Sequence, residues 1–412
     1  MVGQETTAVI GAGVIGSSIA YALAREGRRV LLIDRAPPGE AGASFGNAGH
    51  IATELVEPLP SPGLLFGFWR LLTAFDGPLR IPMRRMPELA PWAWGFARAA
   101  FRRREHTRLL APFVRPAVDT LAGLLRDAGR PELLQRRGHY ELWLRGGAAR
   151  RAAAQARAME ALEVPTAPAP PELLEAARAA ARVNEIAGLW FPKCGHVIDP
   201  LEVVRAFVAA ASEHGASIAR RHVRALVLRG NSIEIASGSD SIVVDRAVVC
   251  GGAWSAPLLT PFGVNVPLQA ARGYHLEMPG AKPLIDAPVL YQDQATFVTP
   301  LAGRIRSTSF MEFEHRDAPQ DPERPAQLRR TLISLGYPAH TAQSPWVGPR
   351  PVLPDYLPAI GRLGSAPNVF YAFGHQHIGL TLSGVTARVV ADLVAGRAPR
   401  VDVSGFDLRR FG

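Results

Sequence analysis

The pattern of apolar and polar residues near the start of the chain predicts a βαβ unit. Residues 8–10 form a short apolar run, and residues 15–23 carry apolar side chains at helical spacing. A second apolar run covers residues 30–33 and ends at Asp34. A strand, a helix and a second strand in this order are typical of a dinucleotide-binding unit.

Three glycines between the first run and the helix have the spacing of a dinucleotide-binding turn. Gly11 allows a tight turn, Gly13 lets the backbone approach a pyrophosphate, and Gly16 allows close contact between helix and strand. Asp34 can accept hydrogen bonds from a ribose diol and disfavours a 2′-phosphate, so we expect NAD or FAD rather than NADP. The alternative is a glycine-rich turn that binds no ligand.

Helical and alternating apolar spacing continues along the chain. It predicts helices over residues 112–128, 147–162 and 200–214, and strands over residues 138–145, 222–228, 232–236, 241–249 and 368–373. Residues 269–345 are again typical of strands. Because this strand-rich region follows the nucleotide-binding part, we expect it to form a second domain whose sheet covers the reactive ring of the cofactor.

Two further segments have the composition of ligand-binding loops. Residues 41–51 are small and polar, and Ser44 and Asn47 could bond a phosphate or a ring heteroatom, although a plain loop would look similar. Residues 374–396 predict a glycine-rich loop followed by a helix, whose N–H groups could stabilise the negative charge of a reduced flavin. His375 and His377 flank this loop and could equally brace it.

Length and composition restrict the class of protein. A chain of 412 residues with 48% hydrophobic content can bury a sizeable core. Its two cysteines, Cys194 and Cys250, exclude a disulfide framework and favour a reducing compartment. The first strand follows the N-terminus almost directly, so we expect no secretory or transit segment and a cytoplasmic protein. The net charge of +10 comes with no nucleic-acid-binding motif, so we expect no nucleic-acid partner.

Residues 64–110 interleave aromatic and basic side chains, but no apolar run is long enough to span a bilayer. One interpretation is a surface that lies on an anionic membrane, at the inner face of the cytoplasmic membrane. The other is a helical subdomain with solvated arginines and packed aromatic rings. The side chains concerned are Trp69, Trp92, Trp94, Phe96 and Phe101, with Arg84, Arg85, Arg98, Arg102, Arg103 and Arg104.

Five stretches together resemble the D-amino acid oxidase family of FAD-dependent oxidoreductases, and are most similar to its bacterial D-amino acid and D-hydroxyproline dehydrogenases. They are VIGAGVIG with Asp34, ASFGNAGHI, VVCGGAWS, GPRPVLPDYLPAIG and GHQHIGLTLSGVTARVVADLVAG, spread over residues 9–396. The resemblance implies an α/β fold with a Rossmann-like FAD-binding domain built from discontinuous segments. An α+β substrate domain with a mainly antiparallel sheet would complete the chain. The implied FAD-binding segments are 1–80, 196–268 and 346–412, and the implied substrate-domain segments are 81–195 and 269–345.

The resemblance also implies the cofactor and its contacts. We expect non-covalent FAD, because neither cysteine lies in the matching C-terminal loop and His50 follows the NAG triplet instead of standing at a tethering position. We expect no bound metal. The implied cofactor-binding residues are Gly11, Gly13, Val14, Ile15, Gly16, Asp34, Arg35, Ala43, Ser44, Asn47, Ala48, Gly49, His50, Val223, Gly251, Trp254, Gly374, Gly379, Leu380 and Thr381.

The implied reaction is hydride transfer from the α-carbon of a D-amino acid to FAD, which leaves an imine. Arg350 resembles the family arginine that pairs with the substrate carboxylate, a task for which a guanidinium is suited. Tyr291 is a candidate for a second carboxylate contact, with packing as its alternative role. His375 and His377 could bond a ring hydroxyl of the substrate.

A cyclic substrate such as D-proline or cis-4-hydroxy-D-proline is expected, because the C-terminal loop resembles that of hydroxyproline-catabolic members. The expected electron acceptor is a quinone or a redox partner. Alternatives are a sarcosine- or glycine-type amine oxidase and the flavin-carrying subunit of a larger dehydrogenase. An NAD-dependent dehydrogenase would share the βαβ unit but would have no reason for the glycine/histidine loop.

Overall fold

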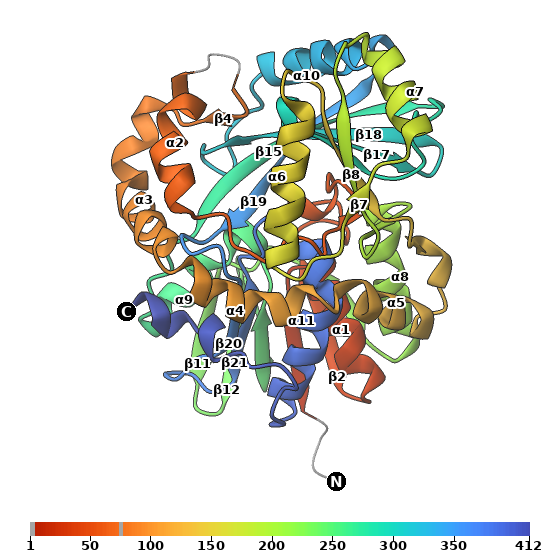
Figure 1. Ribbon diagram of the computed structural model, residues 1–412. Coiled ribbons are helices and arrows are strands. Elements are labelled where there is room, and N and C mark those ends of the chain that lie inside the picture. Colours follow the sequence, from red (N-terminus) through yellow and green to blue (C-terminus); the bar gives the residue numbers. More distant parts are fainter. Residues whose placement is uncertain (1–4, 74–76) are drawn as a thin grey trace.

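The structure, a computed structural model, describes residues 5–73 and 77–412, and for residues 68–73 it describes the backbone alone. Two large sheets organise these residues, one in the lower half of the view in Figure 1 and one in the upper half. The N-terminal βαβ unit belongs to the lower sheet. The predicted fold class, an α/β protein with a discontinuous Rossmann-like part and a mainly antiparallel second sheet, is confirmed.

The lower sheet has six strands that come from three distant parts of the chain. In spatial order they are β10 (Ser217–Arg220), β2 (Arg29–Asp34), β1 (Thr6–Ile10), β14 (Arg246–Val249), β21 (Val369–Phe373) and β20 (Ala359–Arg362). The pairs are parallel except for β20, which runs antiparallel to β21. Neighbouring residues of β1 pack on opposite faces of the sheet. Val9 belongs to one hydrophobic cluster, and Ala8 and Ile10 belong to another.

Different elements cover the two faces of this sheet. Helices α1 (Val14–Arg25), α8 (Pro200–Glu213) and α11 (Gly379–Val394) pack on the Val9 side (Figure 1). The other side carries the antiparallel sheet of β11 (Ala225–Arg229), β12 (Ser232–Ser237) and β13 (Asp240–Val244). The predicted strand over residues 241–249 therefore divides at Asp245, whose carboxylate accepts a hydrogen bond from the Thr6 backbone N–H at 2.7 Å.

The upper sheet has nine strands and is antiparallel apart from two pairs. Its path is β19 (Gln343–Val352), β15 (Gln269–Pro279), β18 (Arg304–Glu312), β17 (Thr296–Leu301), β16 (Val289–Tyr291), β6 (His139–Trp143), β8 (Ala187–Phe191) and β7 (Ala167–Pro168), with β4 (Leu79–Arg80) beside β18. Helices α7 (Pro171–Ala181) and α10 (Glu323–Ser334) contribute to the hydrophobic core on one face. Sequence patterning did not predict α10.

The remaining elements connect these layers. They are α2 (Pro62–Thr73), α3 (Met86–Ala100), α4 (Arg103–Val114), α5 (Ala117–Asp127), α6 (Ala148–Ala161) and α9 (Ala256–Leu259), with a small sheet of β3 (His50–Ile51), β9 (Gly195–Val197) and β5 (Leu134–Gln135). The predicted helix over residues 112–128 is in fact the end of α4 and all of α5, since the chain breaks at Pro116, which has no N–H to donate. No helix in the described ranges is both long and apolar enough to cross a membrane.

Strand β19 lies where the predicted segments meet. It pairs with β15 from Gln343 to Val352 and so belongs to the upper sheet, although the predicted boundary at residue 346 placed its second half in the third FAD-binding segment. Strands β21 and β20, which follow it, belong to the lower sheet. The chain therefore passes between the two sheets within residues 353–358, beside the site described below.

We expect Gly16→Ala to destabilise the protein by at least about 1–3 kcal/mol, as overpacking does. A Cβ at this position in α1 would lie 1.7 Å from the Gly11 carbonyl oxygen, so the glycine turn and the helix would have to separate. Thermal unfolding measures the effect. Gly67→Ala in α2 is the matched control, because its Cβ would meet no atom within 4 Å. Equal melting temperatures for both variants would contradict this explanation.

Candidate functional site

A cavity of about 790 Å³ lies between the two sheets. Its lower wall contains Gly11, Asp34 and Gly251, at the carboxyl ends of β1, β2 and β14. Its upper wall contains Thr308 and Arg350, from β18 and β19. In open α/β sheets ligands bind outside the carboxyl ends of the strands, and this cavity occupies that position.

The turn after β1 has the form that close approach by a dinucleotide requires. Gly11 has φ +108°, and a Cβ there would lie 2.4 Å from the Cys250 carbonyl oxygen, so this position excludes other residues. Gly13 precedes α1 with no side-chain cap of its own. Ser44 reaches across the turn, and its Oγ accepts a hydrogen bond from the Val14 N–H at 3.0 Å.

Asp34 and its neighbours form the outer end of the cavity. The Asp34 carboxylate accepts hydrogen bonds from the backbone N–H groups of Ala12 at 2.6 Å and Ala36 at 3.1 Å, which fix its position after β2. The Arg35 guanidinium lies 4.0 Å from the centre of the Trp254 ring, a cation–π contact. Asp34, Arg35 and Trp254 all line the cavity.

Residues 41–50 form a loop whose backbone carbonyl groups contact side chains of the upper sheet. The Arg306 guanidinium donates hydrogen bonds to the carbonyl oxygens of Phe45 at 3.0 Å and Asn47 at 2.8 Å. Between them, the Gly46 carbonyl lies 3.3 Å from Nδ1 of His275. Sequence reasoning missed Arg306 and His275, because only the pairing of β15 with β18 places them beside this loop.

The N-terminus of α11 meets the cavity at Gly379 and Leu380. No side chain caps this helix, so its first N–H groups are available to a negatively charged ligand. Thr381 faces away from the cavity, and its Oγ1 accepts a hydrogen bond from the Ala52 N–H at 3.0 Å. Thr381 therefore connects the helix to the end of the 41–50 loop and has no direct contact with the cavity.

Arg350 lies in the cavity without a negative partner. Its Nη1 donates a hydrogen bond to the Phe310 carbonyl at 2.9 Å, and no carboxylate in residues 5–73 or 77–412 forms an ion pair with it. The guanidinium lies directly over Gly273, where a Cβ would come within 2.0 Å of Nη2. Desolvation lowers the pKa of Arg350 from its ordinary value. A desolvated guanidinium without an ion pair has donors left that can form a bidentate pair with a carboxylate.

Three residues with unusual backbone conformations lie beside Arg350. One is Phe310, whose φ is +67° and whose carbonyl accepts the hydrogen bond from Arg350. Tyr356 and Gln376 have φ values of +58° and +54°, which are uncommon for residues other than glycine and typical of functional sites. Gln376 links the segment after β19 to the segment after β21. Its side chain accepts a hydrogen bond from the Leu353 N–H at 3.2 Å and donates one to the Gly374 carbonyl at 2.6 Å. Sequence reasoning missed Tyr356 and Gln376, although both lie in the stretches quoted above.

The two predicted histidines have different surroundings. His377 is exposed toward the cavity, and desolvation followed by the nearby Arg350 charge lowers its pKa to about 4. His375 is buried, and its Nε2 lies 3.1 Å from Thr386 Oγ1 of α11. Desolvation lowers the pKa of His375 to about 3. His375 thus braces the helix, and His377 is the histidine whose side chain is available to a ligand.

Tyr291 does not reach the cavity. Its hydroxyl lies 2.9 Å from the Tyr337 hydroxyl in the core beneath α10, on the far side of the upper sheet. The preceding residue, Leu290, lines the cavity instead. Because side chains alternate along a strand, one position separates the two faces, and the predicted carboxylate contact of Tyr291 is not supported.

One cross-strand row forms much of the upper wall. Paired residues run from Trp346 through His275, Thr308, Phe297 and Leu290 to Glu141, one from each of six neighbouring strands. All of them except His275 line the cavity. Burial raises the pKa of Glu141 to about 7, and its carboxylate accepts a hydrogen bond from Gln292 at 2.8 Å.

The predicted cofactor residues fit a dinucleotide in this cavity. The glycine turn before α1, the uncapped N-terminus of α11 and the acid after β2 are the features that a pyrophosphate, a flavin and a ribose require. Gly16, Gly49 and Thr381 are the predicted cofactor residues that do not line the cavity. The predicted residues that line the cavity are Gly11, Gly13, Val14, Ile15, Asp34, Arg35, Ala43, Ser44, Asn47, Ala48, His50, Val223, Gly251, Trp254, Gly374, Gly379 and Leu380.

Comparison with known proteins extends this picture. The model of the DAO family, described as FAD dependent oxidoreductase, matches residues 6–393. A D-amino-acid oxidase of Bradyrhizobium diazoefficiens is 30% identical over 98% of each chain, and D-amino acid dehydrogenase 2 of Pseudomonas aeruginosa is 30% identical over 97% of each. The solved structure of glycine oxidase from Geobacillus kaustophilus has the same fold, with a TM-score of 0.77 and 20% identity over 98% of each chain.

Proposed function

Because the chain belongs to the DAO family of FAD-dependent oxidoreductases, we propose that it dehydrogenates a D-amino acid whose carboxylate binds Arg350. The observation that carries this proposal is the unpaired, desolvated guanidinium of Arg350 in the cavity that the glycine turn also lines. FAD, when bound, accepts the hydride that leaves the substrate α-carbon. The residues of the chain then have to bind the carboxylate, orient the α-carbon and accommodate the amine.

Arg350 can hold the carboxylate in one orientation. The hydrogen bond from Nη1 to Phe310 and the position over Gly273 fix the guanidinium plane, so its other donors can form a bidentate pair. Tyr356 packs beside it, and the burial that raises the pKa of Tyr356 keeps its hydroxyl neutral. A carboxylate held in this way directs the α-carbon into the cavity with little freedom to rotate.

His377 suits the amine end of the substrate. A pKa of about 4 means that the imidazole is neutral at physiological pH, so it does not repel an ammonium group. Its exposure toward the cavity lets a ring nitrogen accept a hydrogen bond from the amine. This contact would orient the amine while the substrate becomes an imine, which water hydrolyses to a 2-oxo acid and ammonia unless it is cyclic.

The wall beyond Tyr356 is apolar and supports an uncharged substrate side chain. Phe96 lies 5.8 Å from the Tyr356 ring, and Trp92 lies 5.3 Å from Phe96 and 5.0 Å from Phe313, measured between ring centres. All four residues line the cavity. We propose cyclic D-amino acids such as D-proline and cis-4-hydroxy-D-proline as candidates, because a ring loses less conformational freedom on binding than an open chain.

A surface on α2 and α3 supports a membrane as the source of the electron acceptor. Phe66 in α2, Trp94 in α3 and Phe101 directly after α3 are 84%, 68% and 73% exposed. On the same helices Leu64 and Leu89 line the cavity from inside, so a lipophilic quinone could approach the cofactor from this side. Trp92 and Phe96 pack inward, as the helical-subdomain interpretation predicted, whereas the Trp69 side chain lies outside the described residues.

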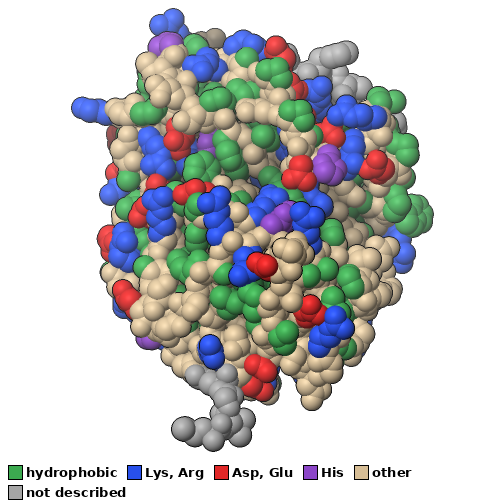
Figure 2. Space-filling model, turned by 180° about the vertical axis from the view of Figure 1, so that it is seen from behind, with side chains coloured by type: hydrophobic (Ala, Val, Ile, Leu, Met, Phe, Trp, Pro, Cys, Tyr) green, Lys and Arg blue, Asp and Glu red, His purple; other side chains and the backbone are tan. Residues whose placement is uncertain are grey.

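Charge at this surface is partly neutralised. Arg84, Arg85, Arg102 and Arg103 pair with glutamates, while Arg98 is exposed without an ion pair in the described part of the chain. Figure 2 shows that basic and acidic side chains are also interspersed on the opposite view of the molecule. We therefore propose that apolar contact at α2 and α3, with a smaller contribution from arginine, would bind the membrane.

Anaerobic mixing of the FAD-loaded protein with amino acids tests the proposed reaction. We expect D-amino acids to bleach the flavin absorbance, with D-proline and cis-4-hydroxy-D-proline among the fast substrates. Bleaching by D-alanine without any response to the cyclic compounds would remove the cyclic preference alone. Bleaching by sarcosine, glycine or L-amino acids only would contradict the D-amino acid assignment.

Arg350→Met should reduce kcat/KM by a factor that corresponds to about 2–5 kcal/mol, because the substrate carboxylate would lose its charged partner. Flavin content should not change, since Arg350 is not one of the predicted cofactor residues. Arg330→Met is the matched control, because Arg330 is an exposed residue of α10. An unchanged kcat/KM in Arg350→Met would show that another group binds the carboxylate.

Co-sedimentation with vesicles tests the membrane proposal. The protein should sediment with anionic vesicles more than with neutral ones, and high salt should release part of it. Replacing Trp94 and Phe101 together by serine should abolish binding, because both side chains are exposed on the proposed surface. Val243→Ser is the control, since Val243 is 62% exposed on β13. Equal sedimentation of wild type and the double variant would refute this surface.

A further inference from the structure

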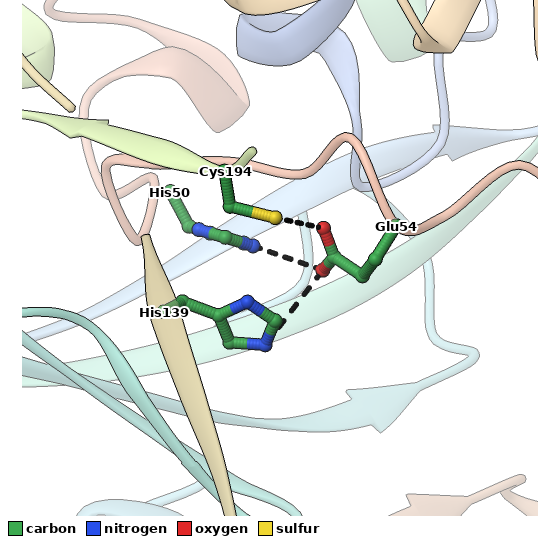
Figure 3. A group of neighbouring side chains, drawn as sticks. All are labelled: His50, Glu54, His139 and Cys194. Atoms are coloured by element: carbon green, nitrogen blue, oxygen red, sulfur yellow. Dashed lines mark hydrogen bonds and ion pairs between the residues drawn. The ribbon is translucent and has the colours of Figure 1, made fainter. Parts of the chain in front are cut away.

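Four side chains that could each bind a metal meet beside the cavity (Figure 3). They are His50 in β3, Glu54 shortly after it, His139 at the start of β6 and Cys194 between β8 and β9. All four are buried, and one ligand atom from each lies within 4.8 Å of the others. Sequence spacing did not predict this group, because separate segments of the chain supply its members.

His50 has acceptors on both sides of its ring. Its Nδ1 lies 3.2 Å from the Gly195 carbonyl oxygen, and its Nε2 lies 2.9 Å from Oε1 of Glu54. A neutral imidazole has a single N–H, so it can satisfy only one of these oxygens. A second proton, carried by His50 or by Glu54, or a metal cation is therefore needed between Nε2 and Oε1. A hydrogen bond from Nδ1–H to a backbone carbonyl is the contact that usually orients a metal-binding histidine.

His139 is the second indication. It is 0% exposed, and neither of its ring nitrogens has a hydrogen-bond partner. Its Nε2 lies 3.9 Å from Oε1 of Glu54 and 3.9 Å from Oε1 of Glu141, too far for hydrogen bonds. Buried polar atoms are rarely left without partners, so this nitrogen indicates a missing one. A second proton on His50 would satisfy Glu54 but would leave His139 unpaired.

We propose that His50, Glu54, His139 and Cys194 form a binding site for a divalent transition metal, with Zn²⁺ as the best match. Two imidazoles, a carboxylate and a thiolate are ligands of the type that Zn²⁺ binds in four-coordinate sites. Ionised Glu54 and Cys194 would balance the charge of the ion. On binding, the Cys194 thiol releases its proton to solvent and the S–metal bond forms.

The site is structural. Four protein ligands leave no open position, which distinguishes structural zinc sites from catalytic ones. Its contacts already link the segments, since Cys194 Sγ lies 2.9 Å from Oε2 of Glu54 and 3.3 Å from Oγ1 of Thr53. A metal here would connect the end of the 41–50 loop to β6 of the upper sheet, and so would hold the cavity wall that His50 and Glu54 form.

Metal analysis of the full-length, FAD-loaded protein tests the proposal. After expression with added zinc and extensive dialysis, we expect about one zinc ion per chain and a higher melting temperature than after chelation. Substitution with Co²⁺ should give the long-wavelength bands of a four-coordinate thiolate site, which lie to the red of flavin absorption. Cys194→Ser and His139→Gln should lose the ion, whereas Cys250→Ser, which removes the other buried cysteine, should keep it.

Several results would overturn the site. Folded, FAD-loaded wild type without metal and without cobalt bands would show that the four side chains do not bind a metal. Equal metal content in wild type, Cys194→Ser and His139→Gln would place the ion elsewhere. If these variants fail to fold, the cobalt spectra of wild type and Cys250→Ser decide the question. Cys194 is then the cysteine that remains to give the bands of a thiolate site.

Discussion

A buried guanidinium connects the two halves of the molecule. Arg306 is held in the upper sheet by Glu277, whose Oε1 accepts from its Nε at 3.0 Å and its Nη2 at 2.6 Å. Its remaining donor group binds the carbonyls of Phe45 and Asn47 in the loop below. Removing a partner from a buried charge costs about 3–5 kcal/mol, so loop and sheet stabilise each other's positions. The upper sheet therefore fixes a loop that forms part of the cavity wall.

The cavity is built differently at its two ends. At the glycine turn the backbone sets the shape, because Gly11 leaves no space for a side chain. At the other end side chains from the upper sheet supply the chemistry, with Arg350 resting on Gly273. The connection that carries Tyr356 lies between these ends and adopts a positive φ value, so conformational strain is stored where the two parts meet.

Local features of the sequence predicted the fold well, and long-range pairing limited the rest. The βαβ unit and the C-terminal helix could be identified because each depends on a few neighbouring residues, whereas Arg350 was proposed from the family resemblance and its role stays a prediction. Tyr291 was wrong as a cavity residue by one strand position, and the break at Asp245 depends on which sheet each half joins. Arg306 and the group around Glu54 could not be predicted, since their partners come from segments far away in the chain.

The row of paired residues across the upper sheet has a consequence for how specificity can change. Each member comes from a different strand. Thr308, Phe297, Leu290 and Glu141 are therefore neighbours in the wall but not in the sequence, and each can be substituted by itself. None of these four residues belongs to the glycine turn or to the uncapped helix ends. A combinatorial library at Thr308, Leu290 and Glu141 would therefore sample many shapes of one wall while the glycine turn stays constant, whereas Phe297 also packs on His50, with 5.1 Å between the ring centres.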